Sequence, residues 1–275
     1  GSAGTGAWSW KGEFDWYQTQ ESRRKAATSQ RSIRQDVITA VRPLACCANF
    51  WGLINETRGC AVKQPHIVFV MTDQQRADTV GAWGHPHMVT PTMDRIAREG
   101  LSFRQAYCPG ATCVASRAAT FTGMYPHTTG VYSFDPWAEH RNWVQDLADA
   151  GYWCVNIGKM HLTPRDEPAG FHERTIVENP TNKTHANGGA DDDWGRFLSH
   201  HGQERPNDRH LTDPEWKQKH QGVPWHLEER FHSDVFIGDA AVSWIRQHQG
   251  DRPLFLQVGF TGPHEPWDPL PRHLE

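Results

Sequence analysis

The sequence has no excess of basic charge. Its 28 Lys and Arg residues are outnumbered by 32 Asp and Glu residues, which gives a formal net charge of -4 and a pI near 6.5. Proteins that bind nucleic acid hold its phosphates with a surplus of Lys and Arg on one face. We therefore expect no nucleic acid partner, although the 17 His residues make the net charge sensitive to pH near 6.

Cysteine is scarce and shows no paired spacing. In 275 residues there are six cysteines, at positions 46, 47, 60, 108, 113 and 154. Disulfide-stabilised secreted domains and zinc knuckles use denser, regularly spaced cysteines, so neither class is expected. The redox compartment stays open, and periplasmic, secreted and cytoplasmic locations are all compatible with the sequence.

The sequence also lacks a long uninterrupted hydrophobic run. The stretch 37–54 is fairly apolar, but Arg42 and Pro43 interrupt it, and a membrane-spanning helix needs about 20 apolar residues. No membrane span is expected, while a signal peptide behind additional upstream sequence stays open as an alternative. Because residues 1–62 show no clean periodicity, we expect them to form a poorly ordered N-terminal extension or linker.

From residue 63 to residue 275 the pattern is that of a globular α/β domain. Apolar, β-branched runs alternate with amphipathic stretches that end near glycine. This alternation predicts a mainly parallel sheet with helices on both faces, and the first strand is expected to be buried on both of its sides. Strands are expected over 66–71, 101–107, 152–157 and 254–260, and helices over 90–100, 143–151 and 231–248.

Polar side chains follow three of these strands. They are Asp73 and Gln74 after the first strand, Lys159 and His161 after the third, and His264 after the last. Each residue alone has an ordinary explanation, such as a turn-capping carboxylate, a surface lysine or a turn histidine. In open parallel sheets, however, the carboxyl ends of the strands carry the ligand site. Their convergence at one edge of the sheet therefore favours a functional site.

The segment 111–123 predicts a loop followed by a short helix that begins at Cys113 and ends at Gly123. Ser116 and Arg117 lie three and four positions after Cys113, so the thiol, the hydroxyl and the guanidinium share one helix face. Backbone N–H groups at the helix start and the Arg117 side chain would bind an oxyanion. The same field is expected to lower the thiol pKa.

Four short motifs resemble, in matching order, those of the sulfatases, a family within the alkaline phosphatase superfamily. The sulfatase signature Cys-x-Pro/Ala-x-Arg is similar to Cys-Val-Ala-Ser-Arg at 113–117, and the first metal-binding turn of the family to Thr-Asp-Gln-Gln-Arg at 72–76. The Gly-Lys-x-His element is similar to Gly-Lys-Met-His at 158–161, and the Pro-His turn to Gly-Pro-His-Glu-Pro at 262–266.

The resemblance covers about residues 65–275 and implies an alkaline-phosphatase-like fold. Family members supply a second metal-ligand pair and another lysine from a later segment. The resemblance therefore implies that 63–275 are the N-terminal part of a catalytic domain, with a sheet that is incomplete at its C-terminus.

This resemblance also implies a nucleophile and a metal site. Cys113 would be oxidised to formylglycine by a maturation enzyme, and one hydroxyl of the hydrated aldehyde would attack sulfur. Asp73, Gln74 and the modified residue 113 would hold Ca²⁺, or another divalent cation such as Mg²⁺ or Mn²⁺.

Four further side chains take catalytic roles in the same comparison. Arg117 and Lys159 would neutralise charge on the transferring group. His264 would protonate the departing oxygen, and His161 would take the second proton of the diol so that sulfate is expelled. The implied activity is hydrolysis of a sulfate ester of a small molecule or saccharide.

Gln74 keeps a second activity open. Many sulfatases have an Asp-Asp pair at this turn, whereas Asp73-Gln74 is similar to the Asp-Gln turn of phosphonate monoester and phosphodiester hydrolases in the same superfamily. A third alternative is a noncatalytic domain that uses the anion pocket without a covalent step.

Residues 179–232 are polar and rich in histidine and tryptophan. The run Asp191-Asp192-Asp193 could bind calcium, but the apolar helix pattern that follows favours a helix-capping role. The segment is expected to form a lid or substrate wall, in which Trp216, Trp225 and His226 meet an aromatic or sugar group.

Overall fold

The computed structural model describes residues 64–178, 192–206, 214, 218 and 222–274. Pro65–Glu275 form one compact unit. The predicted extension over 1–62 and the predicted wall residue Trp216 lie outside the described residues, so both remain predictions.

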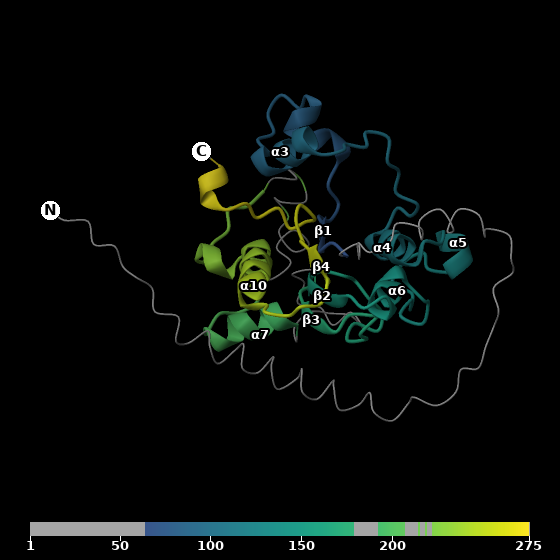
Figure 1. The fold of residues 1–275 in the computed structure, drawn as a ribbon. Coiled ribbons are helices and arrows are strands. Elements are labelled where there is room, and N and C mark those ends of the chain that lie inside the picture. Colours follow the sequence, from purple (N-terminus) through teal and green to yellow (C-terminus); the bar gives the residue numbers. More distant parts are fainter. Residues whose placement is uncertain (1–63, 179–191, 207–213, 215–217, 219–221, 275) are drawn as a thin grey trace, which may run out of the picture. The chain divides into compact units, whose positions relative to one another are not determined.

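Four parallel strands form the described sheet, in the order β1-β4-β2-β3 (Figure 1). They are β1 Ile67–Met71, β2 Trp153–Gly158, β3 Glu173–Ile176 and β4 Leu254–Gly259. Three of these strands and their parallel arrangement confirm the prediction from sequence. β3 is an additional strand, which the charged pair Glu173-Arg174 at its start concealed in the sequence pattern.

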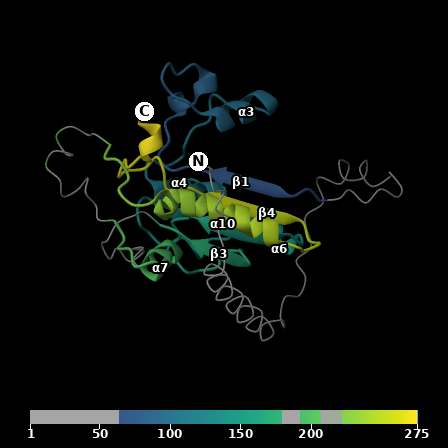
Figure 2. The same cartoon turned by 90° about the vertical axis from the view of Figure 1, so that its left-hand side faces the viewer.

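Helices cover both faces of the sheet, as the alternation of strands and helices predicts. Figures 1 and 2 show α4 Cys113–Thr122 and α6 Trp143–Asp149 on one face, and α7 Asp193–His200 and α10 Ser233–Gln247 on the other. The face under α4 and α6 holds the main hydrophobic core. Side chains that are fully buried there include Phe121, Trp137, Val144, Cys154 and Phe255.

The other described elements are short. α3 Pro91–Glu99 confirms the predicted surface helix, with proline at its first position and Gly100 at its end. The remaining elements are η2 Ala77–Thr79, η3 Gly81–Trp83, α5 Pro126–Thr129, η5 Glu229–Phe231 and η6 Pro271–His273. No helix in the described part of the chain is both long enough and apolar enough to span a bilayer.

The strand expected over 101–107 is wrong. These residues form an irregular segment with a turn, and they pair with none of the described strands. Leu101, Phe103 and Tyr107 are exposed to solvent. The spacing of these apolar residues is similar to the alternation in a half-buried strand. A strand also needs a neighbouring strand to form hydrogen bonds with, and alternation alone does not indicate one.

The expected burial of the first strand is also wrong. Val68 and Val70 in β1 are 54% and 57% exposed. β1 lies at the edge of the described sheet, and α10 packs over β2 and β4 instead. The continuous apolar run therefore predicts β1 correctly as a strand. It does not predict that one face of this strand is exposed.

Candidate active site

The four described strands end level with one another. The register pairs Met71 with Gly259, Gly259 with Gly158, and Gly158 with Ile176. The residues that follow the strands consequently leave the sheet from one row. This edge is where the sequence predicts a functional site.

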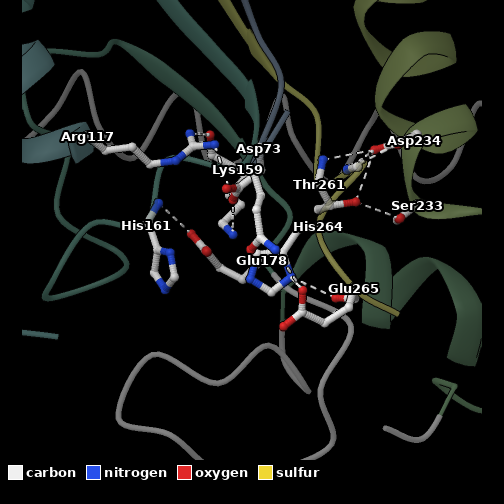
Figure 3. Close-up of polar contacts among 12 residues, drawn as sticks. Asp73, Arg117, Lys159, His161, Glu178, Ser233, Asp234, Thr261, His264 and Glu265 are labelled. Atoms are coloured by element: carbon white, nitrogen blue, oxygen red, sulfur yellow. Dashed lines mark hydrogen bonds and ion pairs between the residues drawn. The ribbon is translucent and has the colours of Figure 1, made fainter. Parts of the chain in front are cut away.

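A polar side chain follows every strand of this row, and Figure 3 shows these side chains gathered at the strand ends. The residues are Asp73 after β1, Lys159 and His161 after β2, Glu178 after β3 and His264 after β4.

Main-chain hydrogen bonds fix these segments to one another. The Asp73 N–H donates to Gly262 O at 3.0 Å, and the Lys159 N–H donates to Gly259 O at 2.7 Å. The turn that carries His264 is thereby tied to the turn that carries Asp73, and both are tied to the end of β2.

Helix α4 begins at Cys113, as predicted, with Thr112 as its N-cap and Gly123 as its left-handed C-cap. Arg117 lies one turn later and reaches the site, where its Nη1 donates to Lys159 O at 2.7 Å. Ser116 instead contacts the Cys108 thiol, with 3.0 Å between Oγ and Sγ. The guanidinium therefore belongs to the site, while the hydroxyl is bound to a neighbouring cysteine.

Asp73, Lys159 and Arg117 form a buried charge cluster. Lys159 Nζ contacts the Asp73 carboxylate directly, and Arg117 Nη2 lies 3.5 Å from Asp73 Oδ2. The side chains are 5%, 0% and 3% exposed respectively. Burial by itself raises the pKa of Asp73, but Lys159 and Arg117 outweigh burial and hold it below its usual value. Asp73 is accordingly an ionised carboxylate between two cations.

The expectation of a lowered pKa at Cys113 is wrong. Burial raises the pKa of the Cys113 thiol, and the repulsion from Asp73 adds to that effect. Lys159 and Arg117 act in the opposite direction but do not compensate. The thiol thus lies among the charges of the cluster and stays protonated at neutral pH.

His161 is buried and held in an unusual backbone conformation. Its φ is +57°, in the left-handed region that most residues with a Cβ avoid. Burial lowers the pKa of the imidazole to about 2, with the repulsion from Lys159 and Arg117 acting in the same direction. The ring is therefore neutral at neutral pH, and Phe134 packs against it edge-on at 5.4 Å between centroids.

Glu178 is a site residue that the sequence pattern did not identify. It is almost fully buried, and its Oε1 accepts a hydrogen bond from the His161 N–H at 3.0 Å. Burial raises its pKa, while Lys159 and Arg117 lower it. The signal that could have found it is the β-branched run Thr175-Ile176-Val177, which marks a strand ending at a carboxylate.

Gln74 and His264 are linked through Glu265, another residue not identified from the sequence. Gln74 Nε2 donates to Glu265 Oε2 at 3.0 Å, and His264 Nδ1 lies 2.7 Å from Glu265 O. Gln74 is exposed and has a φ of +57°. These contacts bring the predicted metal-binding turn and the predicted Pro-His turn side by side.

Comparison with known proteins agrees with this geometry. Residues 65–274 match the sulfatase family over their whole length. The chain belongs to the sulfatase family.

Two curated sulfatases illustrate the relationship. The chain is 30% identical to an arylsulfatase of Clostridium perfringens over 219 residues, which cover 75% of this chain and 44% of the relative. It is 29% identical to an N-acetylglucosamine-6-O-sulfatase of Bacteroides thetaiotaomicron over 239 residues, which cover 86% of this chain and 36% of the relative. The chain thus spans less than half the length of either sulfatase.

Solved structures support the alkaline-phosphatase-like α/β fold. One is the structure of a protein in complex with its substrate D-glucosamine-2-N,6-O-disulfate, with a TM-score of 0.56 and 26% identity over 77% of this chain and 37% of that one. Another is a phosphonate monoester hydrolase of Agrobacterium radiobacter, with a TM-score of 0.57 and 21% identity over 76% of this chain and 43% of that one. At 21% identity the second likeness concerns the fold alone.

The residues predicted to hold a cation in this sulfatase-family site provide part of a donor set. Asp73 offers a buried, ionised carboxylate and Gln74 a carboxamide from the same turn, and hard oxygen donors of this kind suit Ca²⁺. Ca²⁺ takes about six to eight oxygens. Within the described residues there is no group of three or more His, Cys, Asp or Glu side chains that could hold a metal ion. Asp73 therefore fits the role of one ligand in a site that needs further donors.

The described residues after β3 test the predicted capping role of the aspartate run. Asp192 is the N-cap of α7, where its Oδ1 accepts from the Gly195 N–H at 2.8 Å, so the capping role is confirmed. Trp225 is 4% exposed and its indole N–H donates to Glu228 O, and its role as a wall residue stays a prediction. His226 is exposed, and its role as a substrate contact stays a prediction.

Proposed function

We propose that this chain forms the anion-binding side of a sulfate ester hydrolase site. The observation that carries the proposal is the buried charge cluster beside Cys113 at the start of α4. Two buried cations next to a helix N-terminus stabilise a sulfate group and the charge that develops as its ester bond breaks. Membership of the sulfatase family supports this assignment.

Residue 113 is the proposed nucleophile after conversion to formylglycine by a maturation enzyme. The raised pKa of the Cys113 thiol disfavours the unmodified cysteine as the nucleophile, because a protonated thiol is a poor nucleophile at neutral pH. The hydrated aldehyde, once formed, supplies an oxygen nucleophile in its place. Lys159 and Arg117 bind and orient the sulfate group beside this residue and balance its charge.

The two histidines divide the proton transfers in this proposal. His161 is uncharged at neutral pH, and a bound sulfate that balances the charges of Lys159 and Arg117 would raise its basicity, so it is the proposed proton acceptor of the site. His264 Nδ1 lies 2.7 Å from Glu265 O, an arrangement that keeps a proton on Nδ1. Its Nε2 is then the nitrogen that faces the reaction, and it delivers a proton to the departing oxygen when both ring nitrogens are protonated.

Asp73 and Gln74, with residue 113, are the proposed ligands of a divalent cation. Ca²⁺ is the preferred candidate because both side chains offer hard oxygen donors, with Mg²⁺ and Mn²⁺ as alternatives. A cation bound there would supply Lewis acidity and additional positive charge. Asp73 would then share its carboxylate between the cation and the two basic side chains.

Sulfated saccharides are the proposed substrate class. The Bacteroides relative is an N-acetylglucosamine-6-O-sulfatase, and the similar structure at 26% identity holds a glucosamine disulfate as its substrate. A small aryl sulfate is a second suitable substrate, since the Clostridium relative is an arylsulfatase.

The proposal is tested by hydrolysis of 4-nitrophenyl sulfate and of glucosamine 6-sulfate by the chain co-expressed with a formylglycine-generating enzyme. Cys113→Ala should abolish sulfate release. Cys108→Ser is the matched control, because Cys108 is a free thiol five residues upstream, and it should retain activity. Binding of sulfate without release from either ester would favour the noncatalytic domain, and equal activity in Cys113→Ala would refute the nucleophile.

A phosphonate monoester or phosphodiester hydrolase is the second candidate, and Gln74 is the observation that favours it. A neutral side chain in place of a carboxylate leaves more positive charge on a bound cation, which broadens the range of anions it accepts. Gln74→Asp should therefore increase kcat/KM for sulfate esters relative to kcat/KM for phosphodiester and phosphonate esters. An equal change for nitrophenyl sulfate, phosphodiester and phosphonate esters would show that Gln74 does not set the preference.

A further inference from the structure

We propose that Glu178 is a positioning residue that holds His161 in its active orientation. This inference rests on the proposed function, in which His161 accepts a proton. Glu178 follows β3 and His161 follows β2, and the Glu178 carboxylate reaches the His161 main chain across the row of strand ends (Figure 3).

The first support is the backbone of His161. A residue with a Cβ remains at a φ of +57° only when its surroundings hold it there. The surroundings here hold the residue from both sides: the His161 N–H donates to Glu178 Oε1 at 3.0 Å, and Trp137 Nε1 donates to His161 O at 3.0 Å. Loss of the Glu178 acceptor would leave a buried N–H without a partner and release one of the two restraints.

The second support is the way in which Glu178 itself is fixed. The Glu178 N–H donates to Asp192 Oδ2 at 2.8 Å, and the Ile176 N–H donates to Asp193 Oδ2 at 2.7 Å. Asp192 is the N-cap of α7 and also binds the Arg205 guanidinium. The carboxylate that restrains His161 therefore projects from a strand end that is anchored to a helix.

The third support is the burial of a carboxylate where packing alone does not require one. Glu178 Oε2 is buried and has no hydrogen-bond partner within the described residues. The charged groups that act on the carboxylate are Lys159 after β2, Arg117 on α4 and Arg174 on β3. A buried carboxylate with one oxygen left unbonded carries a desolvation cost that an apolar side chain of similar volume would not. The acceptor bond to His161 supplies the reason for an oxygen at this place.

The test compares Glu178→Gln, which keeps an acceptor oxygen, with Glu178→Met, which has a similar length and no strong acceptor. We expect Glu178→Met to lower kcat by about 10- to 100-fold with KM changed by less than about 3-fold, since His161 acts in turnover and not in binding. Glu178→Gln should restore kcat to within about 5-fold of the parent. Glu173→Met is the matched control, because Glu173 is a partly buried carboxylate at the start of β3, the strand that leads to Glu178, and it bonds two indoles instead.

A double substitution separates positioning from a purely structural role. In a His161→Ala background, Glu178→Met should change kcat by less than about 2-fold, because the group it positions is gone. Equal losses in both backgrounds, or an equal loss in Glu173→Met, would overturn the proposal.

A readout independent of activity is amide hydrogen exchange at His161 in the folded chain. Exchange should be at least about 10-fold faster in Glu178→Met than in Glu178→Gln. Unchanged exchange would overturn the positioning role. If exchange responds as expected while His161→Ala leaves kcat unchanged, the proton-accepting role of His161 fails and the contact with Glu178 stands.

Discussion

At the scale of single residues, Asp73 carries the negative charge that two buried cations share. Replacing it with asparagine removes the carboxylate that the Lys159 ammonium contacts and that lies 3.5 Å from Arg117 Nη2. Breaking a buried ion pair by removing one partner destabilises a protein by about 3 kcal/mol or more. We predict a loss of about that size in the free energy of unfolding of Asp73→Asn, measured by urea denaturation.

The matched control is Asp78→Asn. Asp78 lies five residues after Asp73 and forms an exposed ion pair with Arg76. Exposed ion pairs of this kind contribute little to the free energy of unfolding. A similar loss in both variants would contradict the role assigned to the buried cluster.

The buried imidazole of His161 makes the free energy of unfolding depend on pH. Its pKa is about 2 in the folded protein and near 6.5 when unfolded, so between these values the unfolded chain binds the additional proton. Stability is therefore complete above about pH 6.5 and falls by about 1.4 kcal/mol for each pH unit below it. Between pH 7 and pH 5 the parent should lose about 2 kcal/mol more than His161→Asn, which tolerates the left-handed backbone.

Urea unfolding at both pH values measures this difference, and His226→Asn is the exposed control. Asp73 does not interfere, because its lowered pKa contributes stability that is lost only below its ordinary value of 3.8. The raised pKa of Glu178 changes stability with pH in the opposite direction. Glu178 is present in both the parent and His161→Asn, so its effect cancels in the comparison. Identical pH dependence in parent and His161→Asn would refute a neutral, buried imidazole.

At the scale of secondary structure, Gly158 lets the ends of β2 and β4 approach each other. Its φ is +98°, and a Cβ there would overlap the main-chain oxygen of Gly259. We predict that Gly158→Ala lowers the free energy of unfolding by about 3 kcal/mol or more, from backbone strain and steric overlap together.

Gly202→Ala is the control for strain alone, because Gly202 also has a positive φ, of +67°, but open space around it. Gly202→Ala should lower the free energy of unfolding by about 1 kcal/mol. Thermal or urea unfolding measures both variants. Equal losses would show that close approach of the strands is not what Gly158 provides.

Asp234 near the start of α10 fixes the turn that carries His264. One of its carboxylate oxygens accepts from the Thr261 N–H at 2.8 Å and the Thr261 hydroxyl at 3.0 Å, and the Gly262 N–H lies 3.2 Å from both oxygens. Figure 3 shows this carboxylate facing the turn from the helix side. Asp234→Ala should reduce kcat about 10-fold or more, because a loosened turn misplaces His264.

The control for Asp234 is Asp239→Ala, an exposed carboxylate one and a half turns later in the same helix. Its kcat should match that of the parent. Steady-state kinetics on 4-nitrophenyl sulfate measures both, and an unchanged kcat in Asp234→Ala would show that the turn keeps its geometry without the carboxylate.

At the scale of the whole molecule, the sequence predicts those features that depend on local pattern. Strand runs of β-branched residues and helix stops at glycine identify β1, β2, β4 and the main helices, and the polar residues after strands identify Asp73, Lys159, His161 and His264. Parallel pairing then brings these residues to one edge, which no local pattern specifies but the α/β rules imply.

The features that the sequence did not predict depend on contacts between distant segments. Glu178 gains its place through a hydrogen bond to a residue 17 positions away, and β3 begins with two charged residues. The sequence predicts a lowered pKa at Cys113 from the helix start and Arg117, but burial dominates and only the folded environment determines the pKa. The exposure of β1 likewise depends on where α10 packs.

In the proposed function, residue 113 becomes the nucleophile of a sulfate ester hydrolase. The most direct measurement is mass spectrometry of the peptide that contains residue 113, after co-expression of the chain with a formylglycine-generating enzyme. We predict a loss of roughly 18 Da relative to the cysteine peptide, the change expected when a thiol becomes an aldehyde, with the Cys108 side chain unmodified. An unmodified thiol at residue 113 in a folded chain that releases sulfate from 4-nitrophenyl sulfate would contradict the account.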